Sequence, residues 1–214
     1  MRDLLVETAE RVFGRDGGAE ELERSGLLDL GQAGDLHDVA AVIRVSAYHA
    51  TDLDFADRVM PDLGDARLSV ALTRAIQITG ALARVRDLTV RYAADREQFG
   101  QRIDRFQAVQ HELAELAGEA ALADAAVSEA LHDPSLRQIA IAKVASGHAA
   151  GRGAAISHQI HGAVGVTLEH QLHRFTMRLW RWRDEGGSEA YWSASLGKLI
   201  MASRSDQVWE GIAG

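Results

Sequence analysis

The chain has 214 residues, of which 47% are hydrophobic and 25% charged, and this is the size of one domain or of one domain with a small appendage. Its formal net charge of −8 argues against nucleic acid as the main partner, because phosphate binding needs a basic face. The absence of cysteine excludes disulfides and thiolate metal sites, and no apolar run approaches the roughly 20 residues that cross a bilayer, so we expect a cytoplasmic protein that does not enter a membrane.

Glycines divide the first part of the chain into short segments whose apolar residues recur at helical spacing. We predict helices over three ranges: Arg2–Phe13, Ala19–Leu28 and Asp35–Ala50. The range Thr51–Gly64 contains Pro61 and is interpreted as a linker with about one turn of helix. Residues 1–64 are therefore predicted to form an N-terminal helical region that ends in a linker.

Longer helical segments fill the rest of the chain. The spacing of apolar residues and the positions of glycine and proline predict helices over Asp65–Arg96, from a point after Ile103 to near His132, from Pro134 to about Ile160, over Leu168–Arg183 and over Glu189–Ala202. Long helices joined by short loops pack naturally as an antiparallel bundle. We therefore predict an all-α fold, with an antiparallel four-helix bundle over residues 65–214 that follows short N-terminal helices, and with no β domain.

Two stretches are far more specific than the helical pattern. The first is Tyr92–Ile103, which contains Arg-Glu-Gln-Phe-Gly and is followed by Phe106–His111. The second is Gln159–Glu169, which is followed by Arg174. Both stretches in this order, separated by helices of suitable length, form a strong signal. They resemble the acyl-CoA dehydrogenase family, whose members carry an arginine, a polar residue, Phe-Gly, a branched apolar residue and glutamine, and then a Gln-x-x-Gly-Gly-x-Gly signature.

The resemblance implies that the chain contacts FAD. The pyrophosphate of FAD carries two negative charges, and Arg96 offers a planar fork of donors that stays charged at any working pH. By resemblance, Arg96 holds the pyrophosphate of a flavin in a neighbouring subunit. The positions that line the adenosine and the pyrophosphate are, by the same resemblance, Gln98, Phe99, Ile103, Phe106 and Gln107. Gln159 and Gly162 match positions at the adenine end of another flavin across the dimer, and Ala163 replaces the second glycine, so contact there is expected to be looser.

Both motifs also have plainer interpretations. The tripeptide Gln98–Gly100 alone fits a helix stop with an aromatic plug, and Gly162–Gly165 alone fits a helix C-cap followed by a turn. Four histidines form two pairs with i,i+3 spacing: His158/His161 and His170/His173. No further metal ligands adjoin these pairs, so we interpret the histidines as polar residues at the surface or between helices and predict no metal site.

The family removes the α-proton of the acyl group with a carboxylate base while the flavin accepts the hydride. The range Asp184–Glu189 resembles the Glu-Gly-Thr segment that carries this base in the commonest pattern, which makes Glu185 the candidate. The spacing from Arg174 is one residue short, however, and Gly187 replaces the threonine. A solvated residue in a turn is therefore an equally good interpretation of Glu185. The family's other base position falls at Val70, which has no proton to exchange.

The middle β domain of the family is missing between the two helical parts. In the family this domain covers the flavin ring and one wall of the acyl pocket, whereas here Met60–Gly64 joins the parts directly. Proton removal needs a buried, water-poor site, which half a site does not provide. The resemblance thus implies a subunit that completes the flavin site of a full-length acyl-CoA dehydrogenase, in a heterotetramer like those that oxidise steroid or other bulky acyl-CoA esters, with the acyl-CoA bound mainly by the partner. The alternatives are a helical scaffold without flavin and an active homo-oligomeric dehydrogenase.

Overall fold

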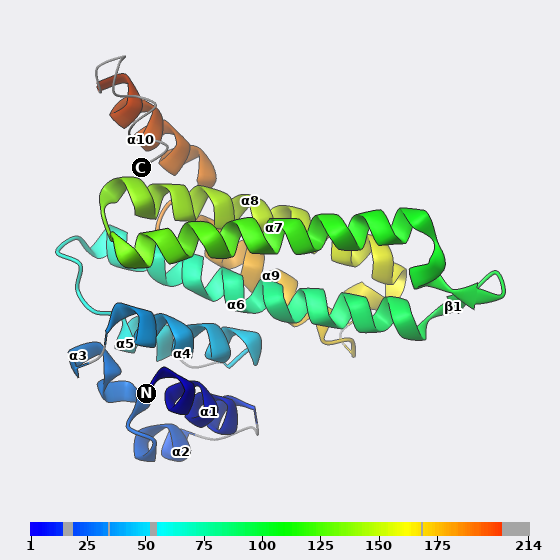
Figure 1. Cartoon of the computed structure of the whole chain (residues 1–214), viewed down its shortest axis with the longest axis horizontal. Coiled ribbons are helices and arrows are strands. Elements are labelled where there is room, and N and C mark those ends of the chain that lie inside the picture. Colours follow the sequence, from blue (N-terminus) through cyan, green and yellow to red (C-terminus); the bar gives the residue numbers. More distant parts are fainter. Residues whose placement is uncertain (15–18, 34, 52–54, 168, 203–214) are drawn as a thin grey trace.

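The computed structural model consists of short helices in the N-terminal region, followed by longer helices (Figure 1). The structure describes residues 1–14, 19–33, 35–51, 55–167 and 169–202. The N-terminal elements are α1 (Arg2–Phe13), α2 (Ala19–Arg24), the 3-10 helix η1 (Leu27–Asp29), α3 (Leu30–Ala33), α4 (Leu36–Tyr48) and α5 (Phe55–Val59). The later elements are α6 (Ala66–Asp95), β1 (Glu97–Gln98), β2 (Gln101–Arg102), the 3-10 helix η2 (Ile103–Arg105), α7 (Gln107–His132), α8 (Leu136–His161), the 3-10 helix η3 (Gly162–Val166), α9 (Leu172–Asp184) and α10 (Glu189–Ala202).

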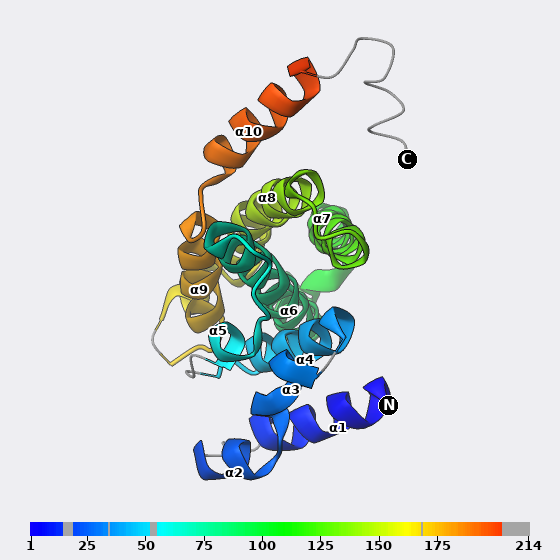
Figure 2. The same cartoon turned by 90° about the vertical axis from the view of Figure 1, so that its left-hand side faces the viewer.

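Helices α6, α7, α8 and α9 form an antiparallel four-helix bundle, which is seen nearly end-on in Figure 2. α8 packs against α6, α7 and α9, and α6 also contacts α7 and α9. α10 leaves the bundle at an angle and contacts α8, where Trp192 is buried. The predicted all-α fold class, with its bundle and its short N-terminal helices, is confirmed.

Side-chain caps fix where the long helices begin. Asp65 precedes α6, and its Oδ1 accepts a hydrogen bond from Arg67 N at 2.7 Å. Ser135 follows Pro134 and precedes α8, and its Oγ accepts from Gln138 N at 3.4 Å. The first amides of a helix have no partner inside the helix, so these oxygens satisfy donors that would otherwise be left open.

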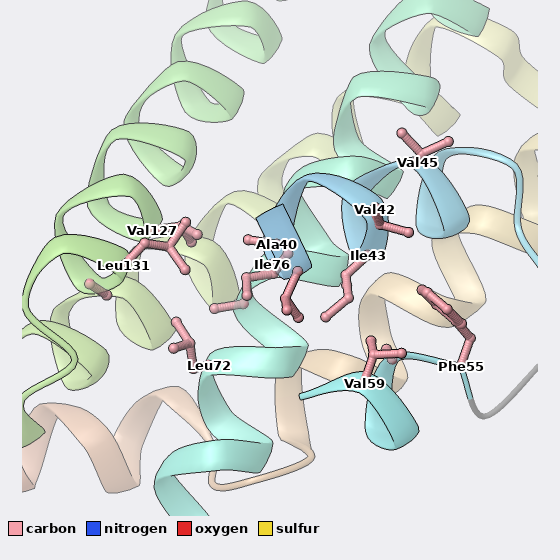
Figure 3. Close-up of a cluster of buried hydrophobic side chains, with 14 of the residues drawn as sticks. Ala40, Val42, Ile43, Val45, Phe55, Val59, Leu72, Ile76, Val127 and Leu131 are labelled. Atoms are coloured by element: carbon pink, nitrogen blue, oxygen red, sulfur yellow. The ribbon is translucent and has the colours of Figure 1, made fainter. Parts of the chain in front are cut away.

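The N-terminal region packs on the bundle mainly through α4 and α6. Where these helices meet, a Cβ added to Gly80 would lie 2.3 Å from Arg44 O, so only a glycine permits this approach of the two backbones. Buried apolar side chains from α4, α5, α6 and α7 continue the contact (Figure 3), among them Ile43, Phe55, Ile76 and Leu131. The N-terminal helices and the bundle therefore share a hydrophobic core.

Several helix boundaries differ from the prediction, most clearly at α2 and α9. The helix predicted over Ala19–Leu28 ends at Arg24, because Gly26 takes a left-handed conformation with a φ of 73° and the chain continues as η1 and α3. The fourth bundle helix begins at Leu172 rather than at residue 168, which lies outside the described residues. Glycine positions alone did not reveal whether a helix stops before or after the short 3-10 segments.

The N-terminal helices lead into the bundle without an intervening β domain. Residues 49–65 connect α4 to α6, and β1 and β2 are the only strands in the part of the chain that the structure describes. The division into residues 1–64 and 65–214 stays a prediction, since α4 and α5 both pack directly on α6. Among the described residues, no helix has the length and apolarity needed to cross a membrane.

Candidate functional site

A short hairpin projects from the end of α6 at one end of the bundle (Figure 1). β1 and β2 pair antiparallel, and Phe99 and Gly100 form the turn between them with φ angles of 51° and 80°. Positive φ at both central residues is typical of tight two-residue hairpins, whose twist matches that of the strands. Behind the turn, Ile103 is buried and its amide donates to Arg96 O at 2.8 Å. The hairpin is thereby fixed to the bundle.

The predicted flavin contacts on this hairpin are mostly exposed. Phe99 is 93% exposed, and its ring meets the ring of Phe106 edge-on at a centroid distance of 6.2 Å. Gln98 and Gln107 are exposed, and Arg96 is exposed directly after the last turn of α6. Within the described residues, the Arg96 guanidinium makes no hydrogen bond and no ion pair. An exposed aromatic ring and an open guanidinium on a fixed hairpin are suited to binding an anionic aromatic ligand.

The second motif lies at the same end of the bundle. Gln159, Gly162 and Ala163 are exposed where α8 ends, and Gly162 has a φ of 61° with open space where a Cβ would point. Between them, His161 is buried and its ring stacks on Tyr92 of α6 at 4.3 Å. Tyr92 Oη also donates to His161 O at 3.3 Å. This stack fixes the end of α8 beside the end of α6, so the structure brings the two predicted motifs together.

The histidines beside this motif lie between helices. His161 Nδ1 donates to Ser157 O at 2.8 Å, and its buried Nε2 has no partner among the residues that the structure describes. Burial outweighs that hydrogen bond and lowers the pKa of His161 to about 4, so the ring is neutral at neutral pH. His158 Nε2 lies 3.0 Å from Thr176 Oγ1 of α9. Across the described ranges, no group of three or more His, Cys, Asp or Glu side chains is arranged to hold a metal ion.

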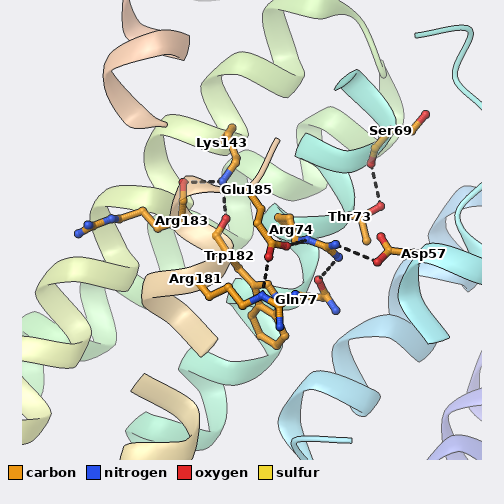
Figure 4. A network of polar contacts seen from close by, with 10 residues as sticks. All are labelled: Asp57, Ser69, Thr73, Arg74, Gln77, Lys143, Arg181, Trp182, Arg183 and Glu185. Carbon is orange, nitrogen blue, oxygen red and sulfur yellow. Dashed lines mark hydrogen bonds and ion pairs between the residues drawn. The ribbon is translucent and has the colours of Figure 1, made fainter. Parts of the chain in front are cut away.

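Glu185 lies at the opposite end of the bundle, directly after α9, in a network of charged side chains (Figure 4). Arg74 Nε donates to one of its carboxylate oxygens and Arg181 Nε to the other, each at 2.5 Å. Arg74 also donates to Asp57 of α5 at 2.8 Å and to Gln77 at 2.8 Å. The network joins α5, α6 and α9.

The two arginines decide the protonation state of Glu185. Burial alone would raise the pKa of its carboxyl, but the hydrogen bond from Arg181 and the charge of Arg74 outweigh burial and lower that pKa. The side chain is only 29% exposed, so it is not a freely solvated turn residue. As a carboxylate held by two arginines, Glu185 is a weaker base than a free carboxylate, because both cations stabilise its ionised form.

The two candidate regions are well separated along α6. Arg74 and Arg96 are 22 positions apart in sequence, which corresponds to about 33 Å along a helix axis. A cavity of about 500 Å³ opens beside Arg74, between α5 and α6. Val70 lines this cavity, so the family's other base position presents an apolar side chain there.

Lys143 was not singled out from the sequence, yet it is the most buried basic residue of the described chain, with 1% of its surface exposed. Its Nζ donates to Trp182 O at 2.6 Å and to Arg183 O at 2.8 Å, at the end of α9 (Figure 4). Burial lowers the pKa of its amine to about 8. A lysine within the apolar run Ile139–Val144 was the available signal, because a charged residue in such a run needs a buried partner.

Comparison with known proteins supports the family assignment. The family model described as "Acyl-CoA dehydrogenase, C-terminal domain" matches residues 57–200. Acyl-CoA dehydrogenase IpdE2 of Mycobacterium tuberculosis is 41% identical over 153 residues, which are 70% of this chain and 44% of the relative. IpdE2 of Mycolicibacterium smegmatis is 36% identical over 110 residues, which are 51% of this chain and 35% of the relative. The chain therefore spans less than half the length of these curated relatives.

Solved structures show the same arrangement of helices. The ChsE4-ChsE5 complex from Mycobacterium tuberculosis matches with a TM-score of 0.63 and 26% identity, over 65% of this chain and 39% of that chain. The acyl-CoA dehydrogenase from Geobacillus kaustophilus matches with a TM-score of 0.60 and 26% identity, over 63% of this chain and 37% of that chain. The resemblance drawn from the two motifs is confirmed: the chain belongs to the acyl-CoA dehydrogenase family, through the C-terminal helical domain of that family.

Proposed function

We propose that this chain is a subunit of an FAD-dependent acyl-CoA dehydrogenase and that it completes the flavin site of a full-length partner. The observation that carries the proposal is the set of exposed groups at the end of the bundle that bears the hairpin. There the exposed guanidinium of Arg96, the exposed ring of Phe99 and the loop at Gly162 lie on one rigid end of the molecule. These groups have few partners within the chain and match the family's flavin contacts.

The residues present fit the chemistry of FAD. A guanidinium can donate two parallel hydrogen bonds to pyrophosphate oxygens, and in a site shielded from water each such bond is strong. Aromatic rings such as Phe99 and Phe106 offer faces and edges to an adenine. The left-handed conformation of Gly162 and the space beside it let a ligand approach the backbone closely. When bound, FAD would accept the hydride from the acyl chain.

A partner is needed because the flavin contacts of this chain cover only part of a cofactor. Residues 49–65 connect α4 to α6 in place of the β domain that covers the flavin ring in the family. A site left open on that side would be wet, and water weakens both the polarisation of the thioester and the base. A full-length acyl-CoA dehydrogenase would supply the missing cover and bind most of the acyl-CoA. The ChsE4-ChsE5 structure is a complex of two differently named chains, which supports a heteromeric assembly here.

Glu185 is the candidate base that this chain itself offers. Its engagement by Arg74 and Arg181 favours the alternative in which the partner supplies the base, because the two arginines lower the pKa of Glu185 and make it a weaker base. In that arrangement Glu185 would hold the end of α9 against α6. We therefore place the base in the partner and test Glu185 separately below.

Co-expression with a full-length acyl-CoA dehydrogenase tests the proposal. We expect a stable yellow complex with the absorbance bands of bound flavin and with acyl-CoA dehydrogenase activity. Arg96→Ala should weaken retention of FAD by about tenfold or more, because it leaves a buried phosphate charge without its donors. Arg24→Ala, which removes an exposed arginine of α2, is the matched control and should retain FAD as the unchanged complex does.

Two outcomes would contradict the proposal. A complex that forms but is colourless would favour the alternative of a helical scaffold without flavin. A yellow, active complex whose FAD content is the same with Arg96→Ala as with Arg24→Ala would show that the hairpin end does not hold the cofactor.

A further inference from the structure

The end of α9 is capped by a side chain from another helix. The last four carbonyl groups of an α-helix have no partner within the helix. Two of those in α9 accept from backbone amides of the following turn, since Glu185 N donates to Arg181 O and Gly187 N to Asp184 O. The other two carbonyls are those of Trp182 and Arg183. Both accept hydrogen bonds from Lys143 Nζ, at 2.6 and 2.8 Å (Figure 4). Every carbonyl at the end of α9 is therefore satisfied, and half of them depend on one amine.

The turn that follows α9, formed by Glu185 and Gly186, packs directly against α6. Glu185 leaves α9 in an extended conformation, and Gly186 follows with a φ of 73°. A Cβ added to Gly186 would lie 2.9 Å from Ala71 N, so the backbone of the turn touches the backbone of α6. Trp192 Nε1 of α10 donates to Gly186 O at 3.1 Å. The turn is thus held by α10 on one side and by Lys143 of α8 at the end of α9.

The chemistry of the amine explains why a lysine occupies this position. Only two of the 23 Lys and Arg residues of the chain are lysines, and Lys143 is the buried one. An ammonium is a compact head with three donors that can reach two adjacent carbonyls, whereas a guanidinium is a wide planar fork. Burial lowers the pKa of the amine most, Asp184 and Glu185 raise that pKa, and Arg74 and Arg183 lower it further. Its position thus links α8 to the arginine network around Glu185.

We infer that Lys143 is a positioning residue, which holds the end of α9 and so fixes the Glu185 turn against α6. Its consequence for the assembled enzyme rests on the proposed function: with the base in the partner, the Glu185 turn has a structural role, so its displacement should leave the chemical step nearly unchanged. Lys143 itself touches neither of these two side chains at hydrogen-bonding distance, and it acts through the backbone of α9.

Hydrogen exchange in the full chain tests the inference without any flavin. Lys143→Met keeps the length and the apolar stem but removes the donors, and Lys198→Met on the exposed face of α10 is the matched control. We expect exchange at the amides of Glu185 and Gly187 to become about tenfold faster in Lys143→Met and to stay unchanged in Lys198→Met. Peptides from the middle of α7 should exchange at the same rate in both variants.

Unchanged exchange at both amides in a folded Lys143→Met chain would overturn the inference. A uniform rise over all peptides would also overturn it, since Lys143 would then stabilise the whole fold rather than the turn. Should Lys143→Met not fold, Lys143→Gln is the second variant. The amide nitrogen of glutamine lies one bond closer to the backbone than Lys143 Nζ, so this variant should still exchange faster at the turn. Exchange as slow as in the unchanged chain would overturn the inference.

The assembled complex gives a second readout. There, Lys143→Met should keep kcat within about twofold, with FAD content and KM for acyl-CoA little changed, because the partner supplies the base and the flavin contacts lie at the other end of α6. Lys198→Met should leave kcat unchanged. A loss of kcat of about tenfold or more in Lys143→Met, with Lys198→Met active, would contradict this role and place the Glu185 turn at the reacting centre. If no partner yields a yellow complex, the proposed function fails, while the exchange measurement still decides the role of Lys143.

Discussion

Three basic residues of this chain differ in their burial and in their partners. Arg74 and Lys143 are largely buried and find their partners on other helices, which satisfies the charge that folding removes from water. Arg96 is exposed, and within the described residues its guanidinium has no partner. The first two stabilise the fold, whereas Arg96 costs little to keep open and is free to bind an anion.

Glu185→Gln separates a structural role from a catalytic one. If the partner supplies the base, kcat of the complex should stay within about twofold, because the substituted amide side chain would still fill the site between the arginines. The unfolding free energy should fall by roughly 1 kcal/mol, since Arg74 keeps Asp57 as a partner. Steady-state kinetics and urea unfolding measure the two effects. Asp57→Asn, which removes the other carboxylate on Arg74, is the control.

A loss in kcat alone of about 100-fold or more in Glu185→Gln, with Asp57→Asn active, would instead place the base at Glu185.

His161 predicts an acid-sensitive step in stability. Its pKa is about 4 in the folded chain, below the ordinary value near 6.5, so the unfolded chain binds more protons between these two pH values. The stabilising contribution is present above pH 6.5 and is lost as the pH falls towards 4, by up to about 3 kcal/mol. His161→Phe keeps an aromatic ring beside Tyr92 and cannot titrate, so its unfolding free energy should fall less over this range.

Urea unfolding at several pH values checks this prediction. His148→Phe, at a largely exposed position on the same helix, should retain the acid-dependent loss. Equal slopes for the unchanged chain and His161→Phe would show that His161 does not titrate in the folded state as described.

At the scale of helices, one close crossing joins the N-terminal region to the bundle. Gly80 is buried in α6, and its backbone lies against Arg44 in α4. The large apolar residues around this contact fill the shared core, so a shift of α4 would disturb many of them at once. The crossing therefore determines the position of the N-terminal helices on the bundle.

Gly80→Ala is expected to destabilise the chain by about 2 kcal/mol or more, because the new methyl group would lie 2.3 Å from Arg44 O and α4 would have to move. Gly118→Ala is the matched control, since Gly118 lies in the middle of α7 with open space beside it. It should stabilise the chain by roughly 0.5 to 1 kcal/mol through helix propensity. Chemical unfolding measures both, and equal effects of the two substitutions would refute the close crossing.

Local patterns predicted the helices well, because apolar spacing, caps and breakers act within a few residues. α1 and α10 span the predicted residues 2–13 and 189–202. The hairpin at Phe99 was not predicted, since two-residue strands are too short to show an alternating pattern. Nor was the contact of Arg74 with Glu185, which joins residues 111 positions apart. Contacts of this kind depend on how helices pack, and packing is not encoded in any one segment.

The candidate site shows the same limit. The resemblance predicted which residues contact flavin, and the antiparallel packing brings Tyr92 and His161 together although they are 69 positions apart. Lys143 escaped notice because its role depends on where α9 ends relative to α8.

For the whole molecule, the bundle separates two regions that would serve an assembled enzyme. The hairpin and the end of α8 form one end, and the Glu185 turn with the cavity beside Arg74 forms the other. Because the bundle is rigid and long, its two ends would contact different parts of an assembled enzyme. Under the proposed function, a second polypeptide would cover both regions in place of the family's β domain.

A structure of the complex with the full-length partner tests this account most directly. We predict that FAD lies in the interface, with its pyrophosphate oxygens within hydrogen-bonding distance of the Arg96 guanidinium and its ring covered by the partner. An interface without flavin at the hairpin, with the Arg96 side chain extending into solvent, would contradict the account.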